Sequence, residues 1–218
     1  MSRPTLRGLI VDFYGVLTDG IESAMRAWTE VDDIEYFEFR AAMAEWFGEA
    51  GAREATFNPV HALERGELEV PDFERQLAGR LTRRDGEPVD PEGLLDRMFG
   101  RFEHAPDMAG LVHRAHRAGL RTALLSNSWG DQYLRSGWDD MFDAVVISGE
   151  VGMRKPERRI FEYTLEQLQM RPDECVFVDD HDRNIWAAAE LGLVGVHHVE
   201  YQQTAMELEV LFGVPLAV

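Results

Sequence analysis

Five short apolar runs, rich in β-branched residues, constrain the fold of this 218-residue chain more than any other feature. Each run ends in or near polar residues, and runs this apolar are typical of parallel strands covered on both faces. Helical patterns separate most of them, so we expect a doubly wound α/β domain with a five-stranded parallel sheet. The expected strands are residues 8–12, 121–126, 144–148, 175–179 and 194–199.

The helices expected before the second run and after the fourth run carry ordinary start and stop signals. A helix over 107–118 precedes Gly119, a plausible C-terminal cap, and another stops at Gly192. Between them, Pro156 is expected to open a helix with an apolar stripe over 160–168.

Residues from about 20 to 103 break the alternation. Apolar residues repeat there at helical spacing, Asn58-Pro59 is typical of a helix start, and no segment favours a strand. We therefore expect a helical insert after the first strand, dividing the chain into a core of residues 1–19 and 104–218 and a helical cap of residues 20–103. The aromatic stripes of this insert are interpreted as core packing rather than as a ligand box.

The composition excludes several partners. Forty Asp and Glu against 22 Lys and Arg give a net charge of −18, which argues against nucleic acid or an acidic membrane as main partner. An anionic small-molecule substrate remains compatible with this charge, because local cations and a bound metal can reverse the local field. The single Cys175 excludes an internal disulfide, and the first residues resemble neither a signal peptide nor a membrane span, so we expect a cytoplasmic location.

Three of the expected strand ends carry side chains capable of chemistry: Asp12, Ser126 and Asp179. Ligands of doubly wound sheets bind beyond the carboxyl ends of the strands, so these residues are expected to share one site. A carboxylate at a strand tip can be a nucleophile or a metal ligand, whereas Asp12 taken alone is more typical of a turn.

Four segments, in this order and at these strand ends, are together far more specific than any one. They are Asp12-Phe-Tyr-Gly-Val-Leu, Leu125-Ser126-Asn127-Ser128, Gly152-Met-Arg-Lys155-Pro156 and Val178-Asp179-Asp180. The set resembles the haloacid dehalogenase superfamily over nearly the whole chain. Glu64-Arg-Gly-Glu-Leu looks like part of the small helical cap of these enzymes. Residues 175–199 look most like the branch that contains the N-terminal phosphatase domain of soluble epoxide hydrolase.

This resemblance implies catalytic roles that ordinary chemistry supports. Asp12 would attack the substrate and form a covalent aspartyl intermediate. Ser126 and the backbone beside Asn127 would hold the transferring group by hydrogen bonds. Lys155 would offset charge on the nucleophile and on the substrate oxygens.

The resemblance also implies a Mg²⁺ site. Asp180, with Asp179 beside it, would hold the ion opposite Asp12, together with the backbone carbonyl of Tyr14, and oxygen ligands suit this ion. Tyr14 departs from the phosphatase pattern, which has a second Asp there to protonate the leaving group. General acid catalysis typically contributes about 10²- to 10⁴-fold, and a phenol with a pKa of about 10 replaces it poorly near neutral pH.

Asp-x-Tyr-Gly is instead the pattern of the L-2-haloacid dehalogenases of this superfamily, whose halide leaves unprotonated. Those enzymes are metal-free and carry Ser and Asn where this chain has Asp179 and Asp180. We favour a Mg²⁺-dependent hydrolase of a small phosphorylated metabolite, because an acidic pair would repel an unneutralised Asp12 and a divalent cation relieves that repulsion. A dehalogenase, a phosphotransferase and a non-catalytic ligand-binding member are the alternatives. The sequence names neither the substrate nor the oligomeric state.

Residues outside these segments are weaker candidates. In the insert they are Arg40, Arg53 and His61, as substrate contacts, and elsewhere Asp19, His104, His181, Asp182, His197 and His198.

Overall fold

A five-stranded parallel sheet forms the centre of the computed structural model, which describes residues 5–18, 20–47, 57–133 and 135–217. The strand order is β3-β2-β1-β4-β5. The prediction of a doubly wound parallel sheet is confirmed. Its strands are β1 (Gly8–Val11), β2 (Arg121–Ser126), β3 (Ala144–Ile147), β4 (Cys175–Asp179) and β5 (Val194–His197).

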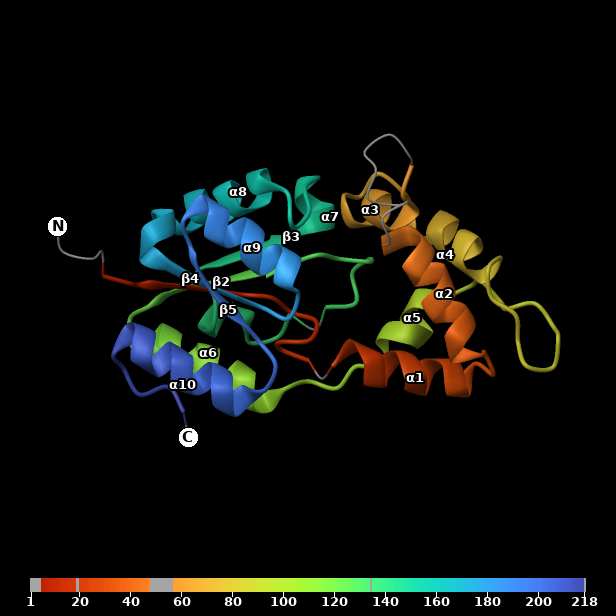
Figure 1. Cartoon of the computed structure of the whole chain (residues 1–218), viewed down its shortest axis with the longest axis horizontal. Coiled ribbons are helices and arrows are strands. Elements are labelled where there is room, and N and C mark those ends of the chain that lie inside the picture. Colours follow the sequence, from red (N-terminus) through yellow and green to blue (C-terminus); the bar gives the residue numbers. More distant parts are fainter. Residues whose placement is uncertain (1–4, 19, 48–56, 134, 218) are drawn as a thin grey trace.

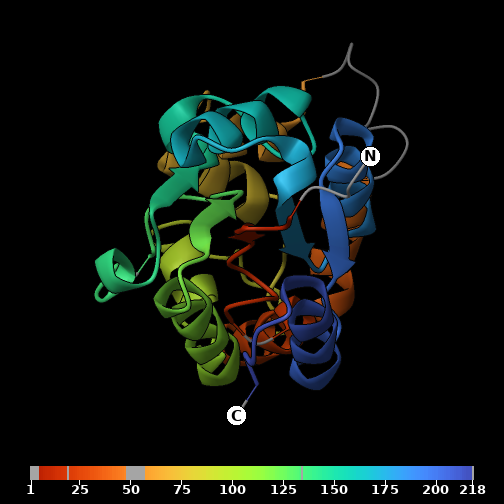
Figure 2. The same ribbon diagram turned by 90° about the vertical axis from the view of Figure 1, so that its left-hand side faces the viewer.

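Helices cover both faces of this sheet (Figures 1 and 2). Leu9 and Val11 face one core with α6 (Pro106–Arg117) and α10 (Tyr201–Phe212), whereas Ile10 faces another with α8 (Arg158–Leu168) and α9 (Asp182–Leu191). Alternate strand residues point to opposite faces, so a strand buried on both sides is apolar throughout. This explains the unbroken apolar runs. Shorter elements complete the core: η1 (Trp138–Asp140), α7 (Ser148–Val151) and η2 (Pro172–Glu174).

Three expected strand ends were placed too late. β1 ends at Val11, β3 at Ile147 and β5 at His197. Ser148 leaves the sheet because it begins α7, and its Oγ accepts the Ser128 N–H at 2.8 Å. Helix α8 begins at Arg158 rather than at Pro156, because Glu157 before it has an extended backbone.

The insert between β1 and β2 is helical, as expected. It comprises α1 (Ile21–Val31), α2 (Tyr36–Phe47), α3 (Pro59–Glu64), α4 (Val70–Ala78) and α5 (Leu94–Phe99). Asn58 starts α3 as predicted, since its side chain accepts the N–H groups of Val60 and His61. The aromatic stripes pack into a separate core whose buried rings are Trp28, Phe39, Trp46 and Phe73.

The insert lies beyond the carboxyl ends of the strands (Figure 1). The chain leaves and re-enters the core at an antiparallel bridge between Thr18 and His104. This bridge lies close to the expected boundaries at 19–20 and 103–104, and the division into two domains stays a prediction. Within the described ranges, no helix combines the length and apolarity needed to cross a membrane.

Candidate active site

Asp12 follows β1 at the carboxyl edge of the sheet, and only 5% of it is exposed. Its N–H donates to the Val178 carbonyl at 2.9 Å, and its Oδ1 accepts the Phe13 N–H at 2.7 Å. Gly15 then turns the chain with φ +79°, and a Cβ there would lie 2.4 Å from Asp180 Oδ2. Only glycine combines this backbone conformation with so close an approach. The turn therefore keeps Asp180 beside the Asp12 loop.

Lys155 bridges two carboxylates in the interior. Its Nζ lies 2.7 Å from Asp12 Oδ1 and 2.6 Å from Asp179 Oδ2, and only 1% of the residue is exposed. Burial alone would lower the pKa of this ammonium, but the two carboxylates outweigh it, and the pKa lies above its usual value. Lys155 is therefore cationic at neutral pH and faces Asp12.

The side chains of Asn127 and Ser126 have different hydrogen-bond partners. The Asn127 side chain accepts the Lys155 N–H at 2.8 Å and donates to the Lys155 carbonyl at 3.0 Å, so it fixes the backbone that carries the lysine. Ser126 Oγ is hydrogen-bonded to the Tyr133 hydroxyl at 2.9 Å. The side chain of Asn127 thus has a positioning contact that its sequence context did not reveal.

Asp179 is fully buried and already engaged on both oxygens. Its Oδ1 accepts the His181 N–H at 2.8 Å, and its Oδ2 accepts a hydrogen bond from Lys155 Nζ. Asn184 Nδ2 lies 2.9 and 3.0 Å from the two oxygens. Asn184 was missed by the sequence reasoning, although it lies five residues after Asp179 on the first turn of α9. These contacts favour Asp179 as the residue that orients Lys155, and its sharing of a metal stays a prediction.

Asp180, the residue after Asp179, carries the third carboxylate of this cluster. Among the described residues, its Oδ1 is a buried side-chain oxygen without a hydrogen-bond partner. Single carboxylate oxygens of Asp12, Asp179 and Asp180 all lie within 4.8 Å of one another. Three acids against one lysine leave excess negative charge. An orphaned buried oxygen in such a cluster fits a hard cation such as Mg²⁺.

The directions of the pKa shifts of these acids agree with this fit. Burial raises the pKa of Asp12 well above its usual value; Lys155 opposes that shift, while Asp179 and Asp180 add to it. The pKa of Asp180 is also raised, chiefly by burial. Both acids hold protons more tightly than free carboxyl groups, and a divalent cation would reverse this.

Tyr14 lies in an aromatic cluster where the core meets the insert. Its ring centroid is 5.0 Å from those of Phe13, Phe99 and Phe102, and 5.8 Å from that of Tyr133. Burial, with the charge of Asp12 beside it, raises the pKa of the Tyr14 phenol above its usual value. The phenol is therefore an even weaker acid than free tyrosine.

Of the weaker candidates, the structure places two against other parts of the site. His197 donates from Nε2 to the Asp180 carbonyl at 2.9 Å. His61 is half-buried in α3, where burial and the nearby Arg154 and Arg65 lower its pKa to about 4. It is neutral at pH 7.

Asp182 contacts one of these two residues, since its Oδ1 lies 3.3 Å from His197 Nδ1. Arg40, His104, His181 and Asp182 are exposed, and His198 is hydrogen-bonded to Thr204 Oγ1. Asp19 and Arg53 lie outside the described residues.

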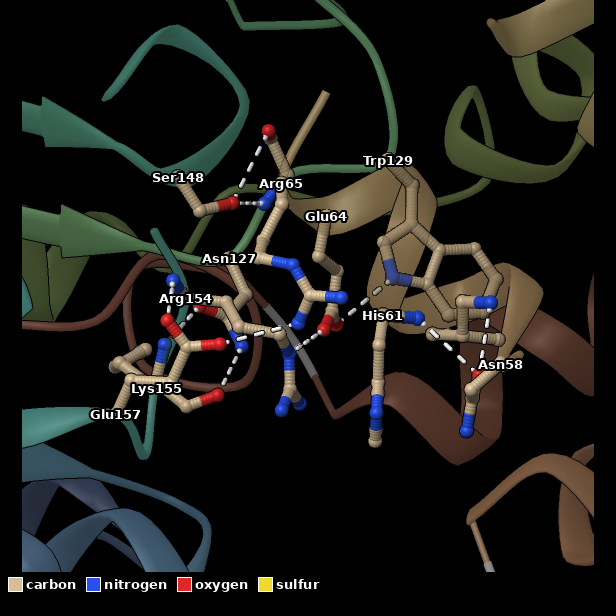
Figure 3. A network of polar contacts seen from close by, with 12 residues as sticks. Asn58, His61, Glu64, Arg65, Asn127, Trp129, Ser148, Arg154, Lys155 and Glu157 are labelled. Atoms are coloured by element: carbon tan, nitrogen blue, oxygen red, sulfur yellow. Dashed lines mark hydrogen bonds and ion pairs between the residues drawn. The ribbon is translucent and has the colours of Figure 1, made fainter. Parts of the chain in front are cut away.

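A further polar network adjoins the site and was not predicted. Glu64 of α3 contacts Trp129 and Arg154, which lie beside Asn127 and Lys155 (Figure 3). Glu64 belongs to the Glu-Arg-Gly-Glu-Leu segment noted in the sequence, but nothing in that segment reveals its partners.

Comparison with known proteins agrees with this architecture. A family model of haloacid dehalogenase-like hydrolases matches residues 6–192. A sesquiterpene phosphatase of Aspergillus oryzae is 28% identical over 69% of this chain and 78% of its own length. Bifunctional epoxide hydrolase 2 of Sus scrofa is 30% identical over 97% of this chain. The chain spans only 40% of that longer protein. These matches confirm the resemblance seen in the sequence.

Among solved structures, a HAD family enzyme of Bacteroides thetaiotaomicron shares the fold with a TM-score of 0.64. It is 20% identical, and the match covers 89% of this chain and 94% of that one. That enzyme was crystallised with magnesium and inorganic phosphate.

Proposed function

Since the chain belongs to the haloacid dehalogenase-like hydrolases, we propose that it is a Mg²⁺-dependent phosphatase of small phosphorylated metabolites, with Asp12 as nucleophile. One observation carries the proposal: the unpartnered Asp180 oxygen lies in a carboxylate cluster with Asp12, which Lys155 alone does not neutralise. A metal-free halide site gives no reason for this acidic excess.

In this proposal Asp12, Asp180 and the Tyr14 backbone carbonyl hold Mg²⁺. The ion, when bound, would neutralise the carboxylates and the oxygens of the substrate phosphate. Asp179 and Asn184 keep Lys155 aimed at Asp12, and Asn127 fixes the backbone of the lysine. Lys155 would then contact the transferring group as well as the nucleophile.

The reaction needs two displacements. A carboxylate oxygen of Asp12 attacks phosphorus, and the ester oxygen leaves with its bonding electrons. Water then attacks the aspartyl phosphate, which releases inorganic phosphate and restores Asp12. Ser126 and the backbone beside Asn127 are proposed to hold the phosphoryl oxygens. With Tyr14 in the acid position, the leaving group departs without a strong proton donor, so good leaving groups are favoured.

The helical insert, residues 20–103, is proposed to act as a cap over the site. It lies beyond the strand ends (Figure 1), where Phe99 of α5 packs against Tyr14 and Glu64 of α3 contacts Arg154. Closing it over a bound substrate would exclude water and complete the site.

Tyr14 supports a second candidate, a carbon–halogen hydrolase, because halide needs no acid. A parallel screen of phosphate monoesters and 2-haloacids, with and without Mg²⁺, separates the two. The proposal predicts Mg²⁺-dependent release of phosphate, whereas Mg²⁺-independent release of halide would replace it with the dehalogenase.

A further inference from the structure

One buried carboxylate connects the insert to the two core loops that carry the proposed phosphate contacts, the loops of Asn127 and Lys155. Glu64, the last residue of α3, is only 4% exposed. Its Oε1 accepts from Trp129 Nε1 at 3.2 Å, and its Oε2 is paired with the Arg154 guanidinium. Trp129 follows Asn127 by two residues and Arg154 directly precedes Lys155, so one side chain reaches both loops (Figure 3).

The backbone beside Glu64 is fitted closely to the core. Gly66 has φ +68°, and a Cβ there would lie 2.7 Å from the carbonyl oxygen of Gly149 in α7. Arg65 Nη1 lies 3.1 Å from Glu157 Oε1. Residues 64–66 are therefore packed closely against the core, and the contacts of Glu64 depend on this packing.

The Glu64–Arg154 ion pair is expected to add little net free energy to the stability of the fold. Both side chains are largely buried, and desolvation of a buried ion pair offsets most of its attraction. Removing either partner, or moving α3 away, leaves an uncompensated charge beside Lys155. The penalty for separating this pair therefore opposes displacement of α3 from the core.

We propose that Glu64 is a positioning residue that couples seating of the insert to phosphate binding. Through Arg154 and Trp129 it holds the Lys155 and Asn127 loops in the geometry that receives the phosphoryl group. When α3 lifts from the core, both loops lose this support. The inference rests on the proposed function in taking phosphate as the group bound.

The test compares Glu64→Gln with Glu74→Gln. Glu74 is a matched control because it lies in the same insert and is 6% exposed, but its Oε1 accepts the Leu95 N–H within the insert. Amide hydrogen exchange is read at Lys155, whose N–H donates to Asn127 Oδ1, and at Ser128, whose N–H donates to Ser148 Oγ. Glu64→Gln is expected to speed exchange at both amides by about 10-fold, and Glu74→Gln at neither.

Calorimetry with inorganic phosphate at saturating Mg²⁺ gives the second readout. Glu64→Gln is expected to weaken phosphate binding by about 10-fold and to raise KM for p-nitrophenyl phosphate more than it lowers kcat, because it loses a charge-assisted contact. Mg²⁺ affinity should not change. The double variant Glu64→Gln/Arg154→Met leaves no unpaired charge and should show the same loosened loops if the single variant folds poorly.

Unchanged exchange at Lys155 and Ser128 would overturn the coupling, whatever phosphate does. Tighter phosphate binding by Glu64→Gln would also overturn it, since Glu64 would then only shield Arg154 from anions. Equal losses in Glu74→Gln would reduce the effect to general destabilisation. A wild-type protein that binds no phosphate with Mg²⁺ present would instead refute the proposed function. In that case the hydrogen-exchange result alone would decide whether Glu64 supports the two loops.

Discussion

Replacing Tyr14 by Phe and by Asp tests whether this chain lacks a general acid. The Tyr14 ring is packed against Phe99 and Phe102, and burial raises the pKa of its phenol above the usual value. Tyr14→Phe keeps the ring and removes only the hydroxyl, so kcat should stay within about 2-fold of wild type. If the phenol were the proton donor, kcat would fall by about 10²-fold or more.

Tyr14→Asp should act in the opposite direction. A carboxyl in these apolar surroundings, beside Asp12, would have a raised pKa and stay protonated, as a general acid requires. Turnover of alkyl phosphates should rise by up to about 10²-fold, while p-nitrophenyl phosphate, whose leaving group needs little proton, should change little.

The same substitution should lower stability. Loss of a half-buried aromatic ring costs about 2–4 kcal/mol. For a chain of this length that corresponds to a Tm lower by roughly 5–15 °C. Assays must therefore be run well below the variant's Tm, with Tyr14→Phe as the stability control.

Steady-state rates on a series of alkyl and aryl phosphates measure these effects. The reasoning is refuted if wild type already hydrolyses alkyl phosphates as fast as aryl ones, because another residue would then donate the proton. An equal gain on both ester classes would point to altered metal affinity or packing instead.

Two further predictions concern the acids. Asp12→Asn should abolish turnover of every substrate while leaving the circular dichroism spectrum unchanged, because the amide keeps the size but not the nucleophilic charge; retained activity would end the covalent mechanism. The raised pKa values of Asp12 and Asp180 mean that the folded protein binds more protons than the unfolded chain, so without Mg²⁺ their ionisation should reduce stability as pH rises through the folded pKa values. Thermal melts of the wild type should show that decline in stability, and Mg²⁺ should offset it. Asp180→Asn should raise Tm in EDTA but abolish stabilisation by Mg²⁺. A lower Tm of this variant than of the wild type in EDTA would contradict the charge argument.

The fold could be predicted because its signals are local. The three central strands, β1, β2 and β4, are largely apolar and are buried on both faces, and Gly119 and Gly192 mark helix ends without reference to distant residues. The strand ends were less certain, since Ser148 leaves the sheet for a partner twenty residues earlier, the Ser128 N–H.

The site could be predicted only in part. Asp12 and Asp180 follow strand ends, Lys155 lies in the loop between α7 and α8, all three belong to recognisable segments, and the structure brings them together. Asn184 lies in no such segment, and the segment of Glu64 does not reveal its partners, because both roles depend on contacts made through space with Asp179 and Arg154. The packing of Tyr14 against α5 could not be seen either, since the path of the insert decides it.

Rapid-quench trapping of a phosphorylated Asp12 tests the central claim most directly. The residue that protonates the leaving group is also placed to take the proton of the attacking water, so a chain without it should form the aspartyl phosphate faster than it hydrolyses it. With p-nitrophenyl phosphate and Mg²⁺, the account predicts a burst of nitrophenol and a peptide mass increase of one phosphoryl group at Asp12, both absent in EDTA and in Asp12→Asn. A burst of nitrophenol that persists in EDTA would contradict the account. Turnover of p-nitrophenyl phosphate with the phosphoryl group on another residue would also contradict it.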